Sequence, residues 1–183
     1  MVSRRAGLGS THPGVTIVVS VPTILQINIS RGGLPKRSIT EADVTTLGIT
    51  GDVQAHPQFH GGPSKALLII TSEGIDELIG QGYSLYYGAM GENLTTRGLD
   101  RRTLRTGQRY RAGSVIFELT TMRIPCDALD PYGPGIRKAV YDAQVKAGDP
   151  SSPRWALSGF YASVLVPGSI RPGDAIQFLE ALA

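Results

Sequence analysis

The sequence predicts a mainly β domain with a few peripheral helices. Its 183 residues suit one domain that can bury a substantial core. The 23 glycines and 12 prolines interrupt the chain too often for a helical bundle. Short apolar runs with the alternation of strands recur between these interruptions. We therefore expect a single domain over residues 23–183, preceded by an N-terminal extension over residues 1–22.

The first part of the domain is expected to contain one strand and a long loop. Residues 24–29 alternate with the period of a strand. Residues 31–36 have the composition of a turn, and a loop rich in Thr, Gly and Asp leads from there towards His56 and His60. Upstream, the apolar residues 15–19 are too few for a convincing secretion signal, so we expect a loose extension or an added strand there.

The rest of the chain is expected to alternate between strands and two helices. Residues 66–70 are typical of a buried strand, and residues 71–73 could cap a helix over residues 74–79. The other elements are expected in this order: two or three strands between residues 93 and 119 with a hairpin turn at 111–114, one helix over 134–146, and strands over 160–166 and 175–179 with a turn at Pro167-Gly168 between them.

The net charge, the absence of long apolar stretches and the single cysteine limit the expected partners and the expected location. The formal charge of +3 and pI of 9.2 favour anionic ligands, but the basic residues are scattered, so we expect no nucleic acid partner. No stretch approaches the roughly 18–20 apolar residues of a membrane span, so we expect no membrane partner. The single cysteine cannot form a disulfide within the chain, which makes a cytoplasmic location the simplest expectation.

That cysteine, Cys126, is the first candidate for chemistry. It follows a predicted strand, where rigid scaffolds often present reactive groups. The nearby Arg123 would favour the thiolate, which is the form that attacks electrophiles or binds a soft metal. The alternative is a buried cysteine that acts as a small hydrophobe, which is the commoner role of a lone cysteine.

A second candidate is a possible anion cradle. Gly61 and Gly62 would expose backbone amides, while His60 and Lys65 offer side-chain donors. The alternative is a tight turn with a solvated lysine. His56 and His60 invite a zinc interpretation, which we reject because two histidines without further ligands at suitable spacing do not make a site.

A third candidate pair is Glu92 and Asn93, which lie between a glycine turn and a strand. Their carboxylate and amide could bond polar atoms of a ligand. The alternative is that both satisfy backbone groups at the turn, which is a common use of such residues. The local sequence leaves both possibilities open.

Six short motifs together resemble the MOSC family, which occurs at the C-terminus of molybdenum-cofactor sulfurases, in stand-alone bacterial proteins and in the mitochondrial amidoxime-reducing component. The similarity extends over about residues 24–179 and rests on the order of the motifs. They are Gly51-Asp52, His60-Gly61-Gly62-Pro63-Ser64-Lys65-Ala66, Gly91-Glu92-Asn93-Leu94, Arg123-Ile124-Pro125-Cys126, Ser158-Gly159-Phe160-Tyr161 and Gly173-Asp174.

The resemblance implies a β-barrel domain that binds a molybdenum cofactor, molybdopterin, with Cys126 as the protein ligand to the metal. A nearby acid would assist proton delivery, and Asp127 and Glu92 are the candidates by their position in the sequence and motifs. The segment 127–154 departs from the family as a long insertion, which we expect to form a helical lid. An external electron-donor protein and a small-molecule substrate would be the partners. The residues expected to hold the cofactor are His60, Gly61, Gly62, Lys65, Glu92, Asn93, Arg123 and Tyr161.

Three functions of different classes follow. The first is a molybdenum-dependent oxidoreductase that reduces N-hydroxylated compounds with electrons from outside the chain. The second is a sulfur carrier or transferase in which Cys126 holds a persulfide, because no second thiol of the chain competes for the sulfur. The third is a non-catalytic binding module for small anionic metabolites, in which Cys126 is structural.

Overall fold

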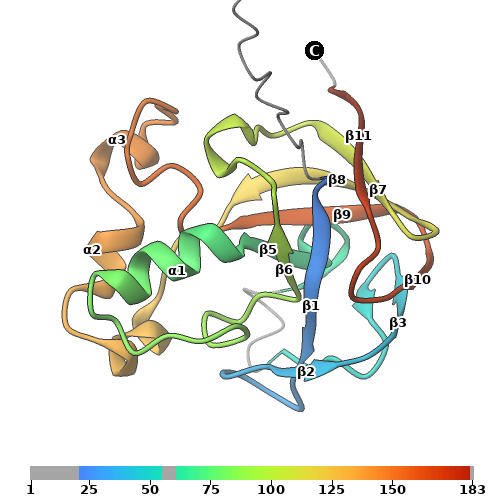
Figure 1. Ribbon diagram of the computed structural model, residues 1–183, viewed down its shortest axis with the longest axis horizontal. Helices are drawn as coiled ribbons and strands as arrows, with labels where there is room; N and C mark the ends of the chain where they lie inside the picture. The colour runs from blue at the N-terminus through green and yellow to red at the C-terminus, as the bar shows by residue number, and fades with distance from the viewer. Residues whose placement is uncertain (1–20, 55–60, 182–183) are drawn as a thin grey trace, which may run out of the picture.

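The computed structural model describes residues 21–54 and 61–181 of the chain (Figure 1). The predicted N-terminal strand or extension and both His56 and His60 lie outside these residues. Eight strands form the larger sheet, in the spatial order β11 (Ile176–Ala181), β7 (Gln108–Ala112), β8 (Val115–Met122), β9 (Phe160–Val166), β5 (Leu67–Thr71), β6 (Leu94–Arg97), β1 (Thr23–Ile29) and β2 (Arg37–Ile39). A smaller sheet contains β10 (Gly168–Ile170), β3 (Ala42–Thr45) and β4 (Gly48–Ile49).

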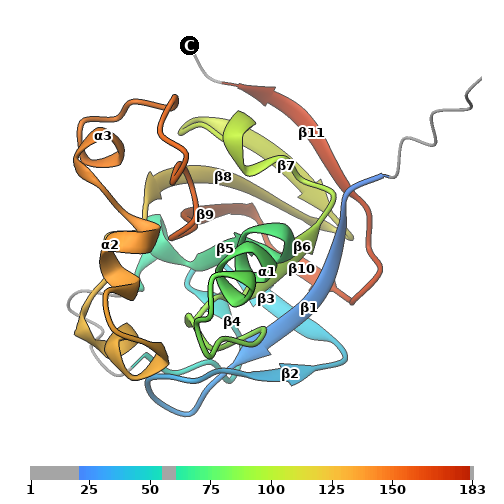
Figure 2. The same cartoon turned by 60° about the vertical axis from the view of Figure 1, so that its left-hand side comes forward.

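The larger sheet is strongly curved, but its described strands do not close into a barrel (Figure 2). Neighbouring strands are antiparallel except for β5 and β6, which are parallel. β2 pairs with residues 27–29 of β1 on the edge that faces away from β6. Only the first residues of β1 can therefore pair with the strand at the other end of the sheet. There, one isolated bridge joins Thr23 to Ala175 just before β11. The mainly β class is therefore confirmed, while the expected barrel is an open, curved sheet.

The three α-helices lie together on one side of this sheet (Figure 1). They are α1 (Ser72–Gly80), α2 (Ile136–Val140) and α3 (Ala143–Lys146). The chain also forms the short 3-10 helices η1 (Pro63–Lys65), η2 (Arg101–Thr103) and η3 (Asp127–Tyr132). The predicted capping of α1 is confirmed, because the Thr71 side chain accepts a hydrogen bond from the Gly74 N–H at 3.2 Å.

Two apolar clusters hold these layers together, and β5 contributes to both. Leu67 and Ile69 belong to the cluster enclosed by the curved sheet, whereas Leu68 and Ile70 belong to the cluster beneath the helices. Successive side chains of a strand point to opposite faces, so a strand buried on both faces must be apolar at every position. This explains the uninterrupted apolar run that the sequence shows here.

The expected single helix over residues 134–146 is wrong. The chain forms two short helices, α2 and α3, because Tyr141 and Asp142 between them have extended backbones. The Asp142 carboxylate accepts a hydrogen bond from the Val145 N–H at 2.8 Å, so it caps the second helix and ends the first. The predicted loop before residue 56 likewise contains the short strands β2, β3 and β4.

Gly159, just before β9, offers a stability test, because its φ is +87° and it has no space for a side chain. A Cβ there would lie 2.6 Å from Ile70 Cγ1 and 2.7 Å from the Ile69 carbonyl oxygen. We expect Gly159→Ala to lower the free energy of unfolding by about 3 kcal/mol, measured by urea denaturation. Gly173→Ala is the control, because Gly173 has a φ of +94° but nothing within 4 Å, and should cost about 1 kcal/mol. Equal losses in the two variants would contradict the steric argument.

Candidate functional site

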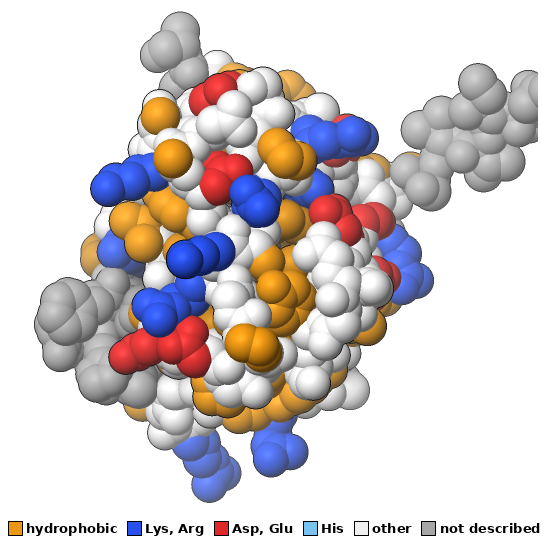
Figure 3. Space-filling model, turned by 90° about the vertical axis from the view of Figure 1, so that its left-hand side faces the viewer, with side chains coloured by type: hydrophobic (Ala, Val, Ile, Leu, Met, Phe, Trp, Pro, Cys, Tyr) orange, Lys and Arg blue, Asp and Glu red, His pale blue; other side chains and the backbone are white. Residues whose placement is uncertain are grey.

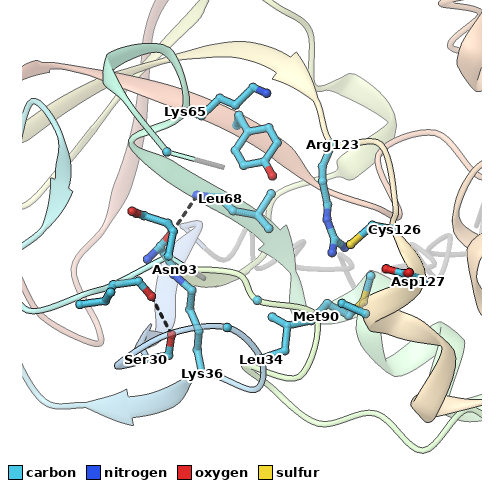
Figure 4. Close-up of a pocket in the computed structure, with 17 residues that line it drawn as sticks. Ser30, Leu34, Lys36, Lys65, Leu68, Met90, Asn93, Arg123, Cys126 and Asp127 are labelled. Atoms are coloured by element: carbon cyan, nitrogen blue, oxygen red, sulfur yellow. Dashed lines mark hydrogen bonds between the residues drawn. The ribbon is translucent and has the colours of Figure 1, made fainter. Parts of the chain in front are cut away.

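A cavity of about 510 Å³ brings together most of the residues that the motifs singled out. This volume is within the range of small-molecule sites. The predicted residues that line it are Gly61, Lys65, Asn93, Arg123, Cys126, Asp127 and Tyr161. Gly62 and Glu92 do not line it, and His60 lies outside the described residues. Figure 4 shows Arg123 and Cys126 on one side of the cavity, with Asn93 and Lys36 on the other.

The segment that carries Cys126 is held where β8 ends. The Arg123 N–H donates to the Gly159 carbonyl oxygen at 2.9 Å, and the Ser158 hydroxyl donates to the Arg123 carbonyl oxygen at 2.6 Å. The chain then turns into η3, whose first turn includes a bond from the Leu129 N–H to the Cys126 carbonyl oxygen at 3.2 Å. As a result, the half-buried Cys126 presents its sulfur to the cavity beside the Arg123 guanidinium (Figure 4).

The Arg123 side chain is a buried cation with unused hydrogen-bonding capacity. The residue is only 3% exposed, and its Nη1 atom has no hydrogen-bond partner among the described residues. A buried donor without a partner costs about 1–3 kcal/mol, and more when it is charged. Since this guanidinium also lines the cavity, an anion bound there would satisfy it.

Lys65 and Tyr161 form the neighbouring wall. The Lys65 ammonium lies 5.4 Å from the centroid of the Tyr161 ring, which is the distance of a cation–π contact. Burial raises the pKa of the Tyr161 hydroxyl, while the charge of Arg123 lowers this pKa and Cys126 raises it. These interactions connect the tyrosine, the arginine and the cysteine in one electrostatic environment.

Lys36 lies in the opposite wall and forms an ion pair that the sequence did not reveal. The Lys36 ammonium pairs with the Asp52 carboxylate, and their side chains are 9% and 2% exposed. Burial lowers the pKa of Lys36, whereas the charge of Asp52 and its hydrogen bond raise this pKa. Lys36 had no assigned role in the sequence, although Asp52 belongs to the first of the six motifs.

Asn93 and the backbone of Ser30, just after β1, complete the support of this pair. The Asn93 side-chain amide donates to Asp52 Oδ2 at 2.8 Å, and the Ser30 N–H donates to Asp52 Oδ1 at 2.8 Å. The side-chain oxygen Oδ1 of Asn93 in turn accepts from the Leu68 N–H at 3.1 Å (Figure 4). Asn93 therefore has a structural function as well as a place in the cavity wall.

Glu92 is buried and does not line the cavity. It is fully buried, and its Oε1 atom accepts from the Gly88 N–H and from the Thr95 hydroxyl, the latter at 3.0 Å. Its Oε2 atom has no hydrogen-bond partner among the described residues. Burial raises the pKa of Glu92, while its hydrogen bonds and the charge of Arg123 lower this pKa. The Glu92 carboxylate is therefore buried in the protein and is not part of the cavity wall.

The segment that was expected to form a lid reaches the cavity only at its start. Asp127 and Ala128 line the cavity, and no later residue up to Arg154 does so. Instead, Leu129, Ile136 and other residues of the segment pack in the apolar cluster beneath the helices. The segment is helical, as predicted, but it covers the outer face of the sheet.

The surface around the helices shows no large basic area. In the space-filling view of this face, Lys and Arg side chains are scattered among acidic and apolar ones (Figure 3). None of the helices in the described ranges has both the length and the apolar character needed to cross a bilayer. Within residues 21–54 and 61–181, no three His, Cys, Asp or Glu side chains gather as a metal site.

In a comparison with protein families, the MOSC domain model matches residues 56–177. The protein YflK of Bacillus subtilis (strain 168) is 30% identical over 133 residues, which are 71% of this chain and 55% of YflK. The protein YiiM of Escherichia coli (strain K12) is 34% identical over 94 residues, which are 49% of this chain and 42% of YiiM. The chain thus spans about half the length of these curated relatives.

Solved structures show the same fold. The crystal structure of YiiM from Geobacillus stearothermophilus has a TM-score of 0.66 and 26% identity, and the alignment covers 87% of this chain and 75% of that one. YiiM from Escherichia coli has a TM-score of 0.64 with 21% identity, covering 90% and 72% of the two chains. The YuaD protein from Bacillus subtilis has a TM-score of 0.62 with 18% identity, covering 86% and 94%.

Proposed function

The chain belongs to the MOSC domain family, and from this premise we propose that it binds a molybdenum cofactor and reduces N-hydroxylated compounds with electrons from an external donor protein. The proposal depends on one observation: the Cys126 sulfur and the Arg123 guanidinium line the same cavity. That guanidinium is buried, and its Nη1 atom has no hydrogen-bond partner among the described residues. A soft ligand for a metal and an anchor for an anion thus lie side by side.

The residues present fit such a cofactor. Cys126 would be the ligand to the metal, because its thiolate is a soft donor. Arg123, Lys65 and Lys36 would hold the anionic groups of the pterin, together with the backbone at Gly61. When bound, the cofactor would supply a metal centre that accepts electrons and passes them to an N–O bond.

The chain's own side chains would prepare this site. The Arg123 guanidinium lies beside the Cys126 sulfur, where it can bind a negatively charged group of a ligand (Figure 4). Asp127 follows the cysteine and lines the cavity, so its carboxyl group is the candidate to carry a proton to the substrate. Leu34, Val53 and Met90 supply apolar surface, which would exclude water around the substrate.

A sulfur carrier or transferase is the second candidate. Cys126 is the only cysteine of the chain and it lines the cavity. A persulfide on it would be an anion next to Arg123, and no second thiol of the same chain could release the sulfur as a disulfide. This role would need a donor enzyme that delivers the sulfur.

The test is metal and pterin analysis of protein made in a host that synthesises the cofactor. We expect about one molybdenum per chain, together with reduction of an N-hydroxylated compound when a chemical reductant is supplied. Protein without molybdenum whose Cys126 gains one sulfur in mass spectrometry would support sulfur transfer instead. Protein with neither would leave a non-catalytic module for anionic metabolites as the function.

A further inference from the structure

We propose that Ser158 is a positioning residue, which holds the Arg123 guanidinium beside the Cys126 sulfur and thereby makes this cysteine selective for anionic reactants. The inference rests on the part of the proposed function in which Arg123 and Cys126 act together, whether the cysteine is a metal ligand or a sulfur carrier. Ser158 itself does not line the cavity. It begins the fifth of the six motifs, in which only Tyr161 had an assigned role.

The first argument is that Ser158 and Gly159 hold Arg123 by both of its backbone polar groups. The Ser158 hydroxyl donates to the Arg123 carbonyl oxygen at 2.6 Å, and the Arg123 N–H donates to the Gly159 carbonyl oxygen at 2.9 Å. Ser158 is 0% exposed, so its bond to the carbonyl oxygen is closed to water. A chain without this hydroxyl would have to move to find another donor for the buried oxygen.

The second argument is that the chain from Arg123 to Cys126 has little other support. Arg123 is the first residue after β8, so the strand ladder ends there. Among the described residues, the backbone N–H groups of Ile124 and Cys126 find no acceptor, and Pro125 has no N–H. The next anchor is the bond from the Leu129 N–H to the Cys126 carbonyl oxygen at 3.2 Å. The direction in which the segment leaves the sheet is therefore set at Arg123.

The third argument is the rigidity of the turn that carries Ser158. Ala156 has a φ of +57°, a conformation that is unfavourable for a residue with a side chain and persists only where the surroundings fix it. Here the Gly159 N–H donates to the Ala156 carbonyl oxygen at 3.1 Å, and both Ala156 and Leu157 are buried. Ser158 thus sits on a fixed support, and its hydroxyl determines where the Arg123 carbonyl oxygen lies.

The consequence concerns the two side chains that share the cavity wall. The Arg123 guanidinium and the Cys126 sulfur lie side by side in Figure 4, and both residues line the cavity. The guanidinium attracts an anion that approaches the sulfur, and this attraction weakens as the distance between the charges grows. Ser158 therefore determines how strongly Cys126 prefers an anionic reactant to a neutral one of similar shape.

The experiment compares the rates at which iodoacetate and iodoacetamide alkylate Cys126, the only thiol of the chain, in protein from a host that does not make the molybdenum cofactor. In both reactions the thiolate sulfur forms a bond to the methylene carbon, the carbon–iodine bond breaks and iodide leaves. Because both reagents need the same thiolate, its abundance cancels in the ratio of the two rates. At low ionic strength we expect the iodoacetate-to-iodoacetamide ratio to fall at least about threefold in Ser158→Ala. Ser158→Thr restores the hydroxyl and should restore the ratio.

Ser152→Ala is the matched control, because Ser152 is a buried serine of the same connection between α3 and β9, and its hydroxyl donates to Asp142 Oδ2 at 3.0 Å. It should lower the stability without changing the ratio, which separates an effect on the cysteine from a general loss of packing. Arg123→Gln gives the ratio without the guanidinium.

The outcomes separate this inference from the proposed function. If the unchanged protein and Arg123→Gln give the same ratio, the cation does not act on the sulfur, and the inference fails together with its premise in the proposed function. If these two differ but Ser158→Ala keeps the ratio of the unchanged protein, Ser158 has no positioning role, while the proposed function stands. A ratio in Ser158→Thr as low as in Ser158→Ala would also contradict the role of the hydroxyl.

Discussion

Cys126→Ser is expected to lose bound molybdenum, with a fall in the metal-to-chain ratio of at least about tenfold. The serine hydroxyl has nearly the size of the thiol, but it is a hard, neutral ligand where the thiolate is soft and anionic. Because Cys126 is half-buried at the cavity wall, the substitution leaves the packing of the fold largely unchanged. Elemental analysis of both proteins from the same host measures the ratio directly.

Ile124→Ser is the matched control for this experiment. Ile124 lies in the same segment, is 69% exposed and does not line the cavity. We expect it to retain molybdenum at the level of the unchanged protein. Both variants should keep the thermal unfolding midpoint of the parent within a few degrees, which separates loss of the ligand from loss of the fold. Full metal content in Cys126→Ser would exclude Cys126 as the ligand.

Asp52→Ala is expected to lower the free energy of unfolding by about 3–5 kcal/mol. The substitution leaves the Lys36 ammonium buried without its counter-charge, and it also removes the acceptor for the Ser30 N–H and the Asn93 amide. Breaking one side of a buried pair costs more than the pair contributes, since the remaining charge cannot reach water freely. Urea denaturation at neutral pH measures the loss.

Two comparisons make this result specific. Lys36→Met combined with Asp52→Ala should recover part of the stability, because no unpaired charge remains. Glu41→Ala removes an exposed partner of Arg171 and should cost less than about 1 kcal/mol. A loss for Asp52→Ala as small as that for Glu41→Ala would show that the buried pair does not stabilise the fold.

The family, the central cysteine and most of the regular elements could be predicted from the sequence. β1, β5, α1 and β9 lie where periodicity and capping place them, because these signals are local and the tertiary structure does not oppose them. The motif order identified the residues at Lys65, Arg123 and Cys126 as a group. The cavity contains all three.

Other features were beyond local patterns. The sequence around residues 134–146 has helical spacing throughout, yet Asp142 caps a new helix and also pairs with Arg154, which is distant in the chain. The strands β2, β3 and β4 have two to four residues each, too few to give a readable period. These three strands are recognised by the strands with which they pair, because their own residues show no strand pattern.

By itself the sequence determined a mainly β domain of the MOSC family, and it singled out one cysteine and nearby cations as the candidate site. Only the tertiary structure decided that Lys36 in the cavity wall forms a buried pair with Asp52, that Glu92 is fully buried outside the cavity lining, and that Arg123 Nη1 has no hydrogen-bond partner within residues 21–54 and 61–181. The physical reason is that burial and charge compensation depend on groups that the sheet brings together from distant parts of the chain. The residues next to a group in the sequence indicate neither its burial nor the charge that compensates it.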